Sequence, residues 1–146
     1  DPFVKAQSGY ALMRMGEDAG GKALVRLMEK EPRGSKPGIL AAYYLSRLDD
    51  DRGLDYLIRI MERRDGPLRP LAAEALGKSG NKKAVLPLTE GLSSPDREMR
   101  LMIIRALGRL GGKLAIYQLH KVVEDQDRTI ADAAGLALAD LGEWAD

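Results

Sequence analysis

The chain has 146 residues, of which 45% are hydrophobic and 31% are charged, and its formal net charge is +1. This length and composition suit one domain with a buried core, while the near-neutral charge argues against a polycation that coats nucleic acid. The absence of cysteine excludes disulfides and thiolate catalysis, and no apolar run reaches the ~18–20 residues that cross a membrane.

A leucine followed within a few positions by a residue that ends a helix, Gly or Asp, recurs along the chain. The intervals are 33, 31, 31 and 31 residues, between Leu12, Leu45, Leu76, Leu107 and Leu138. A period of about 20–50 residues is typical of solenoids. We therefore expect an all-α solenoid of antiparallel helical hairpins, with about nine helices in a right-handed superhelix. The expected single domain, 1–146, divides into repeats at about 1–34, 35–64, 65–94, 95–124 and a half repeat 125–146.

The first two repeats each combine two apolar stripes. In the first, the second stripe opens at Gly20 and Gly21, and in the second it opens at Gly53. Such small residues suit places where helix backbones approach closely. The second repeat also carries two extra residues between Lys30 and Gly38, among Pro32, Gly34 and Pro37. We expect this junction to be the irregular point of the stack.

The third repeat, 65–94, is the cleanest copy. We expect Asp65 to cap its first helix with a carboxylate, and Gly80 to end that helix. The turn of about four residues requires the two helices to be antiparallel. Since one hairpin cannot bury both apolar stripes alone, stacking must close the core.

The fourth repeat has the same stripes, but the last segment supplies only one helix, expected at 127–141. Charge is uneven here, because residues 125–146 hold one basic and six acidic side chains. Together with Trp144, this acidic end suits either a terminal cap or a truncated array. The chain lacks an initiator Met, so we expect it to be excised from a longer protein or processed. The compartment stays open, with the cytoplasm slightly favoured.

Several short runs share a pattern that starts with Asp and continues with an apolar residue and a base. They are 1–5, 65–69 and 96–100, and Ala-Leu-Gly-x-x-Gly follows at 75–80 and 106–111. These runs resemble the bacterial HEAT-like repeat, of the type that includes phycobiliprotein lyase subunits. The resemblance covers the whole chain. It implies a ladder of Asp–base contacts between neighbouring repeats, and a concave side lined by the second helices.

Two sets of charged residues admit a structural and a functional interpretation. We interpret the Asp–base pairs as helix caps tied to adjacent repeats rather than as a binding edge, which assigns structural roles to Arg69 and Arg100. The second set is a basic row near the ends of the first helices: Arg14, Arg47, Lys78 and Arg109. Partial negative charge at a helix C-terminus favours such cations. A row that reads phosphate groups is the alternative.

The outward positions of the second helices vary most between repeats, as positions that touch partners do in repeat scaffolds. We therefore expect a non-catalytic scaffold that binds a protein partner on the concave face of the second helices. One outward row has one residue from each second helix, and it consists of Arg26, Arg59, Glu90 and Lys121. The partner is expected to be acidic, since three of these four residues are basic. The candidate binding residues are Arg26, Tyr56, Arg59, Glu90, Tyr117, His120 and Lys121.

Other functions find less support in the sequence. His120 is the only histidine, so neither a zinc site nor a catalytic triad can be assembled, and we expect no enzyme and no cofactor. The adjacent Asp49, Asp50 and Asp51 are interpreted as a polar turn. One alternative is a tetrapyrrole chaperone like the phycobilin lyases. The other is a nucleic-acid-binding module, which the charge balance and the scarcity of aromatic residues oppose.

Overall fold

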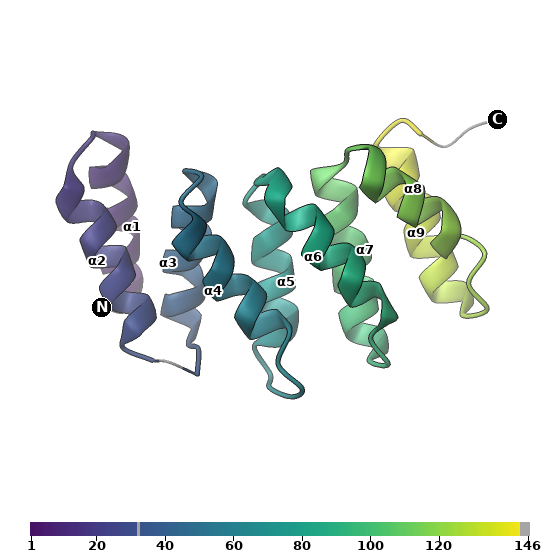
Figure 1. Cartoon of the computed structure of the whole chain (residues 1–146), viewed down its shortest axis with the longest axis horizontal. Coiled ribbons are helices and arrows are strands. Elements are labelled where there is room, and N and C mark those ends of the chain that lie inside the picture. The colour runs from purple at the N-terminus through teal and green to yellow at the C-terminus, as the bar shows by residue number, and fades with distance from the viewer. Residues whose placement is uncertain (32, 144–146) are drawn as a thin grey trace.

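The computed structural model describes residues 1–31 and 33–143, so Pro32 and Trp144 lie outside the described residues. Within these ranges the chain forms nine α-helices and no strand, as the repeat pattern predicts. Figure 1 shows the helices as a row of hairpins, with α1 and α9 at opposite ends. None of the described helices is both long and apolar enough to span a membrane. The right-handed sense of the superhelix and the division into repeats stay predictions.

The helices form two layers. The first helices of the repeats are α1 (Pro2–Arg14), α3 (Lys36–Arg47), α5 (Arg69–Lys78), α7 (Arg97–Leu110) and α9 (Arg128–Asp140). The second helices are α2 (Asp18–Glu29), α4 (Asp51–Met61), α6 (Val85–Glu90) and α8 (Lys113–Val122). Two short 3-10 turns, η1 (Lys82–Ala84) and η2 (Gly91–Ser93), flank α6. In Figure 1 the second helices form the layer nearer the viewer.

Aspartates cap three of the first helices, and the caps at Asp1 and Asp96 confirm the prediction. The Asp1 carboxylate accepts a hydrogen bond from the Phe3 amide at 2.9 Å, and Asp96 and Asp127 cap α7 and α9 in the same way. The prediction for Asp65 is wrong. Helix α5 begins only at Arg69, with Leu68 at the N-cap position and no side-chain cap, because the chain first turns through Gly66 (φ +125°) and a proline.

The junction before α3 replaces the aspartate with a serine. The Ser35 hydroxyl accepts a hydrogen bond from the Gly38 amide at 3.0 Å, and this caps α3. The chain reaches that point through Gly34, whose φ of +99° is a conformation that glycine adopts readily. The two extra residues predicted to be irregular are therefore used in a turn that glycine and serine make possible.

The repeated leucine forms the centre of the core. Leu45, Leu76, Leu107 and Leu138 are fully buried, whereas Leu12 is 38% exposed. In the described part of the chain α1 packs on another first helix, α3, on one side only. Stacking therefore closes the core, and the end of the stack leaves its leucine partly open.

Within a hairpin the two helices approach closely where the second one starts. A Cβ atom at Gly20 would lie 2.3 Å from the Gly9 carbonyl oxygen, and one at Gly53 would lie 2.3 Å from the Ala42 carbonyl oxygen. Neither distance is tolerable for a carbon atom, so only glycine fits. This confirms the predicted close approach at Gly20 and Gly53, whereas Gly21 faces only the Met13 side chain.

Successive first helices pack directly against each other, most closely in the C-terminal half. A Cβ atom at Gly77 would lie 2.6 Å from the Cα of Ala106, and one at Gly108 would lie 2.8 Å from the Cβ of Ala137. Helix α3 carries bulkier residues, Tyr44 and Ser46, at the positions that Ala106 and Gly108 hold in α7. The junctions on either side of α3 are correspondingly wider.

Successive second helices stay farther apart. Helices α6 and α8 pack directly against each other. Helix α4 instead contacts the third hairpin's second half chiefly at the short turn η1, which precedes α6. The concave position of the second helices, which the family resemblance implies, stays a prediction.

Ion pairs between arginine and aspartate link the last repeats, but the aspartate that caps α9 pairs with Arg97 and not with the predicted Arg100. Arg97 donates to the Asp127 carboxylate at 2.6 Å, while Arg100 pairs with Asp125 in the turn before α9. Arg69 instead donates to two backbone carbonyls of the preceding turn, that of Met61 at 3.1 Å among them. These arginines thus have structural partners, in agreement with their interpretation.

Candidate functional site

Three tyrosines and two arginines gather on the outer surface of α1 and α3. The rings of Tyr10 and Tyr44 stack with their centroids 4.4 Å apart and an interplanar angle of 13°. The guanidinium carbons of Arg14 and Arg47 lie 6.0 Å and 5.8 Å from the Tyr10 centroid. Helical spacing explains the cluster, since tyrosine precedes arginine by four residues on each helix and so shares its face. We call these residues, with Tyr43, the tyrosine–arginine cluster.

Arg47 is the best fixed member of the cluster. Its guanidinium donates a hydrogen bond to the Tyr43 hydroxyl oxygen at 3.1 Å and lies 5.8 Å from that ring's centroid. The hydrogen bond to Tyr43 raises the pKa of Arg47 above its ordinary value, so the side chain stays cationic. The pair therefore places a positive charge, which attracts anions, beside an aromatic ring, which contacts apolar groups.

The cationic charge of the cluster is not neutralised by described carboxylates. Neither Arg14 nor Arg47 forms an ion pair with any residue in the described ranges. The acidic turn after α3 is engaged elsewhere, because Asp50 pairs with Arg52 at 2.6 Å and Asp51 pairs with Lys83 at 2.9 Å. The cluster therefore presents two cations to an incoming group.

A groove of about 460 Å³ lies beside the cluster, between α3 and α5. Tyr43 belongs to both the cluster and the groove. Apolar side chains dominate the lining, while Lys36 stands near the start of α3 and Lys78 near the end of α5. The groove exists because the α3–α5 junction is wide. Its lining residues are Phe3, Lys36, Ile39, Leu40, Tyr43, Leu71, Glu74, Ala75 and Lys78.

The same surface continues over α7 and α9. A second cavity of about 480 Å³ lies between these helices, with exposed Arg105, Arg109 and Leu136 in its lining. Asp140 ends the basic row, at the position that Arg109 occupies one repeat earlier. We call the whole outer surface of the first helices the first-helix face. It combines aromatic, apolar and basic side chains from one end of the stack to the other.

The sequence-predicted residues lie on the opposite surface, which we call the second-helix face. Six of the seven are exposed, and they come from four different helices: Arg26, Arg59, Glu90, Tyr117, His120 and Lys121. On α8, the Lys121 ammonium lies 4.5 Å from the centroid of the exposed Tyr117 ring. No hydrogen bond or ion pair between described residues joins any two of the six.

Tyr56 does not belong to that exposed set, and its prediction as a surface anchor is wrong. Only 2% of it is exposed, and the guanidinium of Arg59 covers its ring at 5.5 Å. The hydroxyl lies against Gly38, where a Cβ atom would be only 2.4 Å away. The irregular junction before α3 thus makes room for this side chain. Burial raises the pKa of the Tyr56 hydroxyl.

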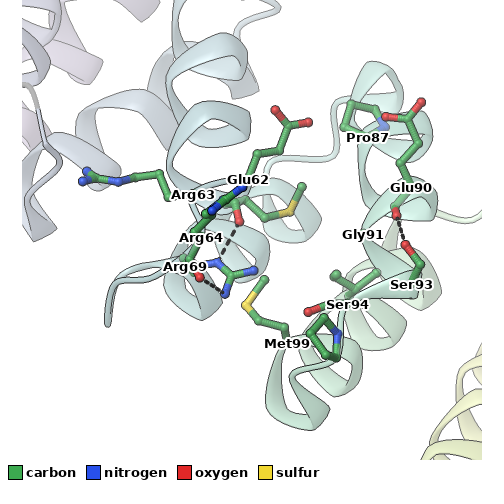
Figure 2. Close-up of a pocket in the computed structure, with 13 residues that line it drawn as sticks. Glu62, Arg63, Arg64, Arg69, Pro87, Glu90, Gly91, Ser93, Ser94 and Met99 are labelled. Carbon is green, nitrogen blue, oxygen red and sulfur yellow. Dashed lines mark hydrogen bonds between the residues drawn. The ribbon is translucent and has the colours of Figure 1, made fainter.

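A pocket of about 450 Å³ lies where the turn after α4 meets the end of α6 (Figure 2). Figure 2 shows the Arg69 side chain turned back onto its own turn, where it donates to two backbone carbonyls. Arg63 extends away from the pocket, and both Glu62 and Glu90 add negative charge to its rim. This mixture of charges and the engaged Arg69 indicate a structural junction between hairpins.

The structure also describes no group of three or more His, Asp or Glu side chains, within residues 1–31 and 33–143, that could hold a metal ion. Comparison with known proteins identifies the chain by its repeats. A family model described as HEAT repeats matches residues 54–139. The chain belongs to the HEAT-repeat family.

An engineered protein of known crystal structure has the same fold as this HEAT-repeat chain. The match has a TM-score of 0.58 at 19% sequence identity, and it covers 96% of this chain and 71% of the engineered one. No curated protein matches the chain. HEAT repeats generally serve as scaffolds for protein interaction, and the fold is typically non-catalytic.

Proposed function

We propose that this HEAT-repeat protein is a non-catalytic scaffold that binds an acidic protein partner on its first-helix face. The observation that carries the proposal is the tyrosine–arginine cluster beside the apolar groove. Tyrosine and arginine are enriched in protein interfaces and dominate their binding energy. Here both types are partly exposed next to apolar side chains, and the two arginines have no described carboxylate partner.

Charge complementarity supports an acidic partner. Lys36 and Lys78 flank the groove, and the arginines of the cluster stand beside it. Lys78 is partly neutralised by Glu74, at 2.7 Å, but the other three cations are available in the described structure. A partner segment with apolar residues between carboxylates would match this distribution, and its approach would be accelerated by electrostatic attraction.

The second-helix face is the alternative surface. It offers exposed charges and the Tyr117–Lys121 contact, but α2, α4 and α6 carry only one exposed candidate residue each, and the second helices are farther apart. Glu90 also interrupts the series of basic residues Arg26, Arg59 and Lys121 on that face. An interface needs a central group of closely packed anchors. The first-helix face meets that condition with three tyrosines in contact.

Matched charge reversals distinguish the two faces. One variant carries Lys36→Glu and Lys78→Glu, at the ends of the groove, and the other carries Arg59→Glu and Lys121→Glu. Each reverses two exposed cations, so both shift the net charge by the same amount. A partner is first captured with the natural protein from cells of the source organism, and then purified for affinity measurements against both variants.

We expect the groove variant to lose at least about tenfold in affinity, or ~1.4 kcal/mol, because two favourable contacts become repulsive. The second-helix variant should lose less than about threefold. Circular dichroism must show that both variants stay helical. A larger loss in the second-helix variant would overturn the choice of face and return the interaction to Arg59 and Lys121.

A further inference from the structure

We propose that the tyrosine–arginine cluster is a phosphoryl-binding site, which receives a phosphorylated residue of the partner while an apolar residue of the same segment enters the adjacent groove. The identity of the carrier as a protein segment rests on the proposed function. The anion site itself rests on the geometry of α1 and α3.

Two guanidinium groups converge on one aromatic ring. Arg14 approaches Tyr10 from the same helix and Arg47 approaches it from α3, each to within 6.0 Å of the centroid. Both cations thus lie beside the same ring, and no described carboxylate offsets their charge. An anion bound at this ring would be attracted by both guanidiniums, so the arrangement favours a ligand with more than one negative charge.

The hydrogen-bonding groups also match a phosphoryl group better than a carboxylate. Arg47 uses one N–H on the Tyr43 oxygen, which leaves the Tyr43 hydroxyl hydrogen free to donate to a ligand. The remaining N–H groups of the two arginines add further donors. A phosphoryl group carries a charge of about −1.5 to −2 and three strong acceptor oxygens. A carboxylate carries one charge, which a single arginine already satisfies in a bidentate contact.

The other repeats lack this arrangement, and they provide an internal comparison. At the place of Tyr10 and Tyr43, later repeats have Glu74, Arg105 and Leu136. In the third repeat the glutamate already neutralises the base of the row, through the Lys78–Glu74 pair at 2.7 Å. Arg109 has the same place in its helix as Arg47, but without a tyrosine four residues earlier. The anion site is therefore specific to the first two repeats.

The adjacent groove indicates which kind of residue lies near the phosphorylated one in the ligand. Because Tyr43 lines both the groove and the cluster, a ligand on the arginines would lie at the edge of the apolar lining. A large apolar side chain a few residues from the phosphorylated one would reach Leu40 and Leu71. The expected ligand is thus a phosphorylated segment with a nearby apolar anchor.

The anion site is tested first by titration with inorganic phosphate. Binding is monitored by NMR of the arginine side-chain Nε–Hε signals, and acetate serves as the monovalent comparison. We expect saturable shifts of Arg14 and Arg47, and a phosphate affinity at least tenfold higher than that of acetate. Arg47→Ala should abolish saturable binding, whereas the matched variant Arg109→Ala should leave it unchanged. Equal affinity for both anions, or an equal loss in both variants, would overturn the proposal.

The carrier is tested with a library of phosphorylated peptides whose flanking positions are randomised, applied to the immobilised protein. Phosphorylated peptides with an apolar residue nearby should be retained by the natural protein and lost from Arg47→Ala. Tighter binding of a duplex oligonucleotide than of any peptide would overturn the assignment to a protein segment. Phosphate binding without a partner on the first-helix face would refute only the proposed function, and a partner on that face without phosphate binding would refute only this inference.

Discussion

At Gly77 and Gly108 the side chain is a single hydrogen atom, and the neighbouring first helix occupies the space that a larger residue would need. Both positions follow the repeated leucine directly, and both face an alanine of the next repeat. Ser46 holds the same position in α3, where the stack is wider and the groove opens. The size of one residue per repeat thus determines how closely neighbouring first helices approach each other at that point.

This explanation predicts that Gly77→Ala destabilises the protein by about 1–3 kcal/mol, because the added Cβ atom would lie 2.6 Å from the Ala106 backbone. The matched control is Gly21→Ala. There a Cβ atom would meet only the Met13 side chain, at 3.6 Å or more, so stability should be unchanged or rise by up to ~1 kcal/mol. Urea unfolding measures both, and equal effects of the two substitutions would contradict the close packing of α5 and α7.

The repeated leucines give a second prediction for single residues. Leu76→Ala and Leu107→Ala should each cost roughly 2–5 kcal/mol, since both side chains are fully buried. Leu86 has the same side chain but is 58% exposed on α6, so Leu86→Ala should cost less than about 1 kcal/mol. Thermal or urea unfolding of the three variants provides the comparison. A cost below about 1 kcal/mol at Leu76 or Leu107 would contradict the burial assigned to the repeat.

Residue patterns predicted buried and capping positions better than surface positions. The leucine period and the aspartate caps follow from rules that act within one or two turns of helix, and most of them are confirmed. Tyr56 was predicted on the surface, but Arg59 covers its ring and its hydroxyl lies against Gly38 of α3. The cluster at Tyr10 and Tyr43 was missed, although both tyrosines precede an arginine of the basic row by four residues.

At the scale of elements, α7 and α9 are joined by charge as well as by packing. Arg97 contacts the Asp127 carboxylate that caps α9, and Arg100 contacts Asp125 just before it. The hydrogen bond from Arg97 lowers the pKa of Asp127. The pKa of Asp125 is lowered chiefly by the backbone N–H of Asp127, and also by Arg100. Both carboxylates are therefore held in their charged form in the folded protein.

These shifts predict a loss of stability in acid. Because the folded pKa of each aspartate lies below its ordinary value of 3.8, the stabilisation is present above that pH. It decreases as the pH falls further and the carboxylates take up protons. The melting temperature should therefore decline more steeply below about pH 4 in the natural protein than in Asp125→Asn/Asp127→Asn, which keeps the hydrogen-bond acceptors without the charge. Parallel curves for the two proteins would exclude these residues as the source of acid sensitivity.

At the scale of the whole molecule, the repeat predicted the hairpins and their stacking but not how closely successive first helices pack. Both helices of a repeat have one apolar stripe, so the hydrophobic pattern indicates which side of a helix is buried but not the width of each junction. That width depends on contacts such as the one between Gly77 and Ala106. This contact joins different repeats, and the period gives the place of each residue within its repeat but not the distance between the two.

The central claim is that a partner binds the first-helix face, and NMR chemical-shift mapping with the purified partner tests it most directly. Our proposal predicts that the largest backbone and side-chain shifts come from α1, α3 and α5, around Tyr10, Tyr43 and Leu71. The signals of Arg26, Arg59 and Lys121 should stay nearly unchanged. Largest shifts on α2, α4 and α8, with the tyrosine–arginine cluster unaffected, would contradict the claim and assign the interaction to the second-helix face.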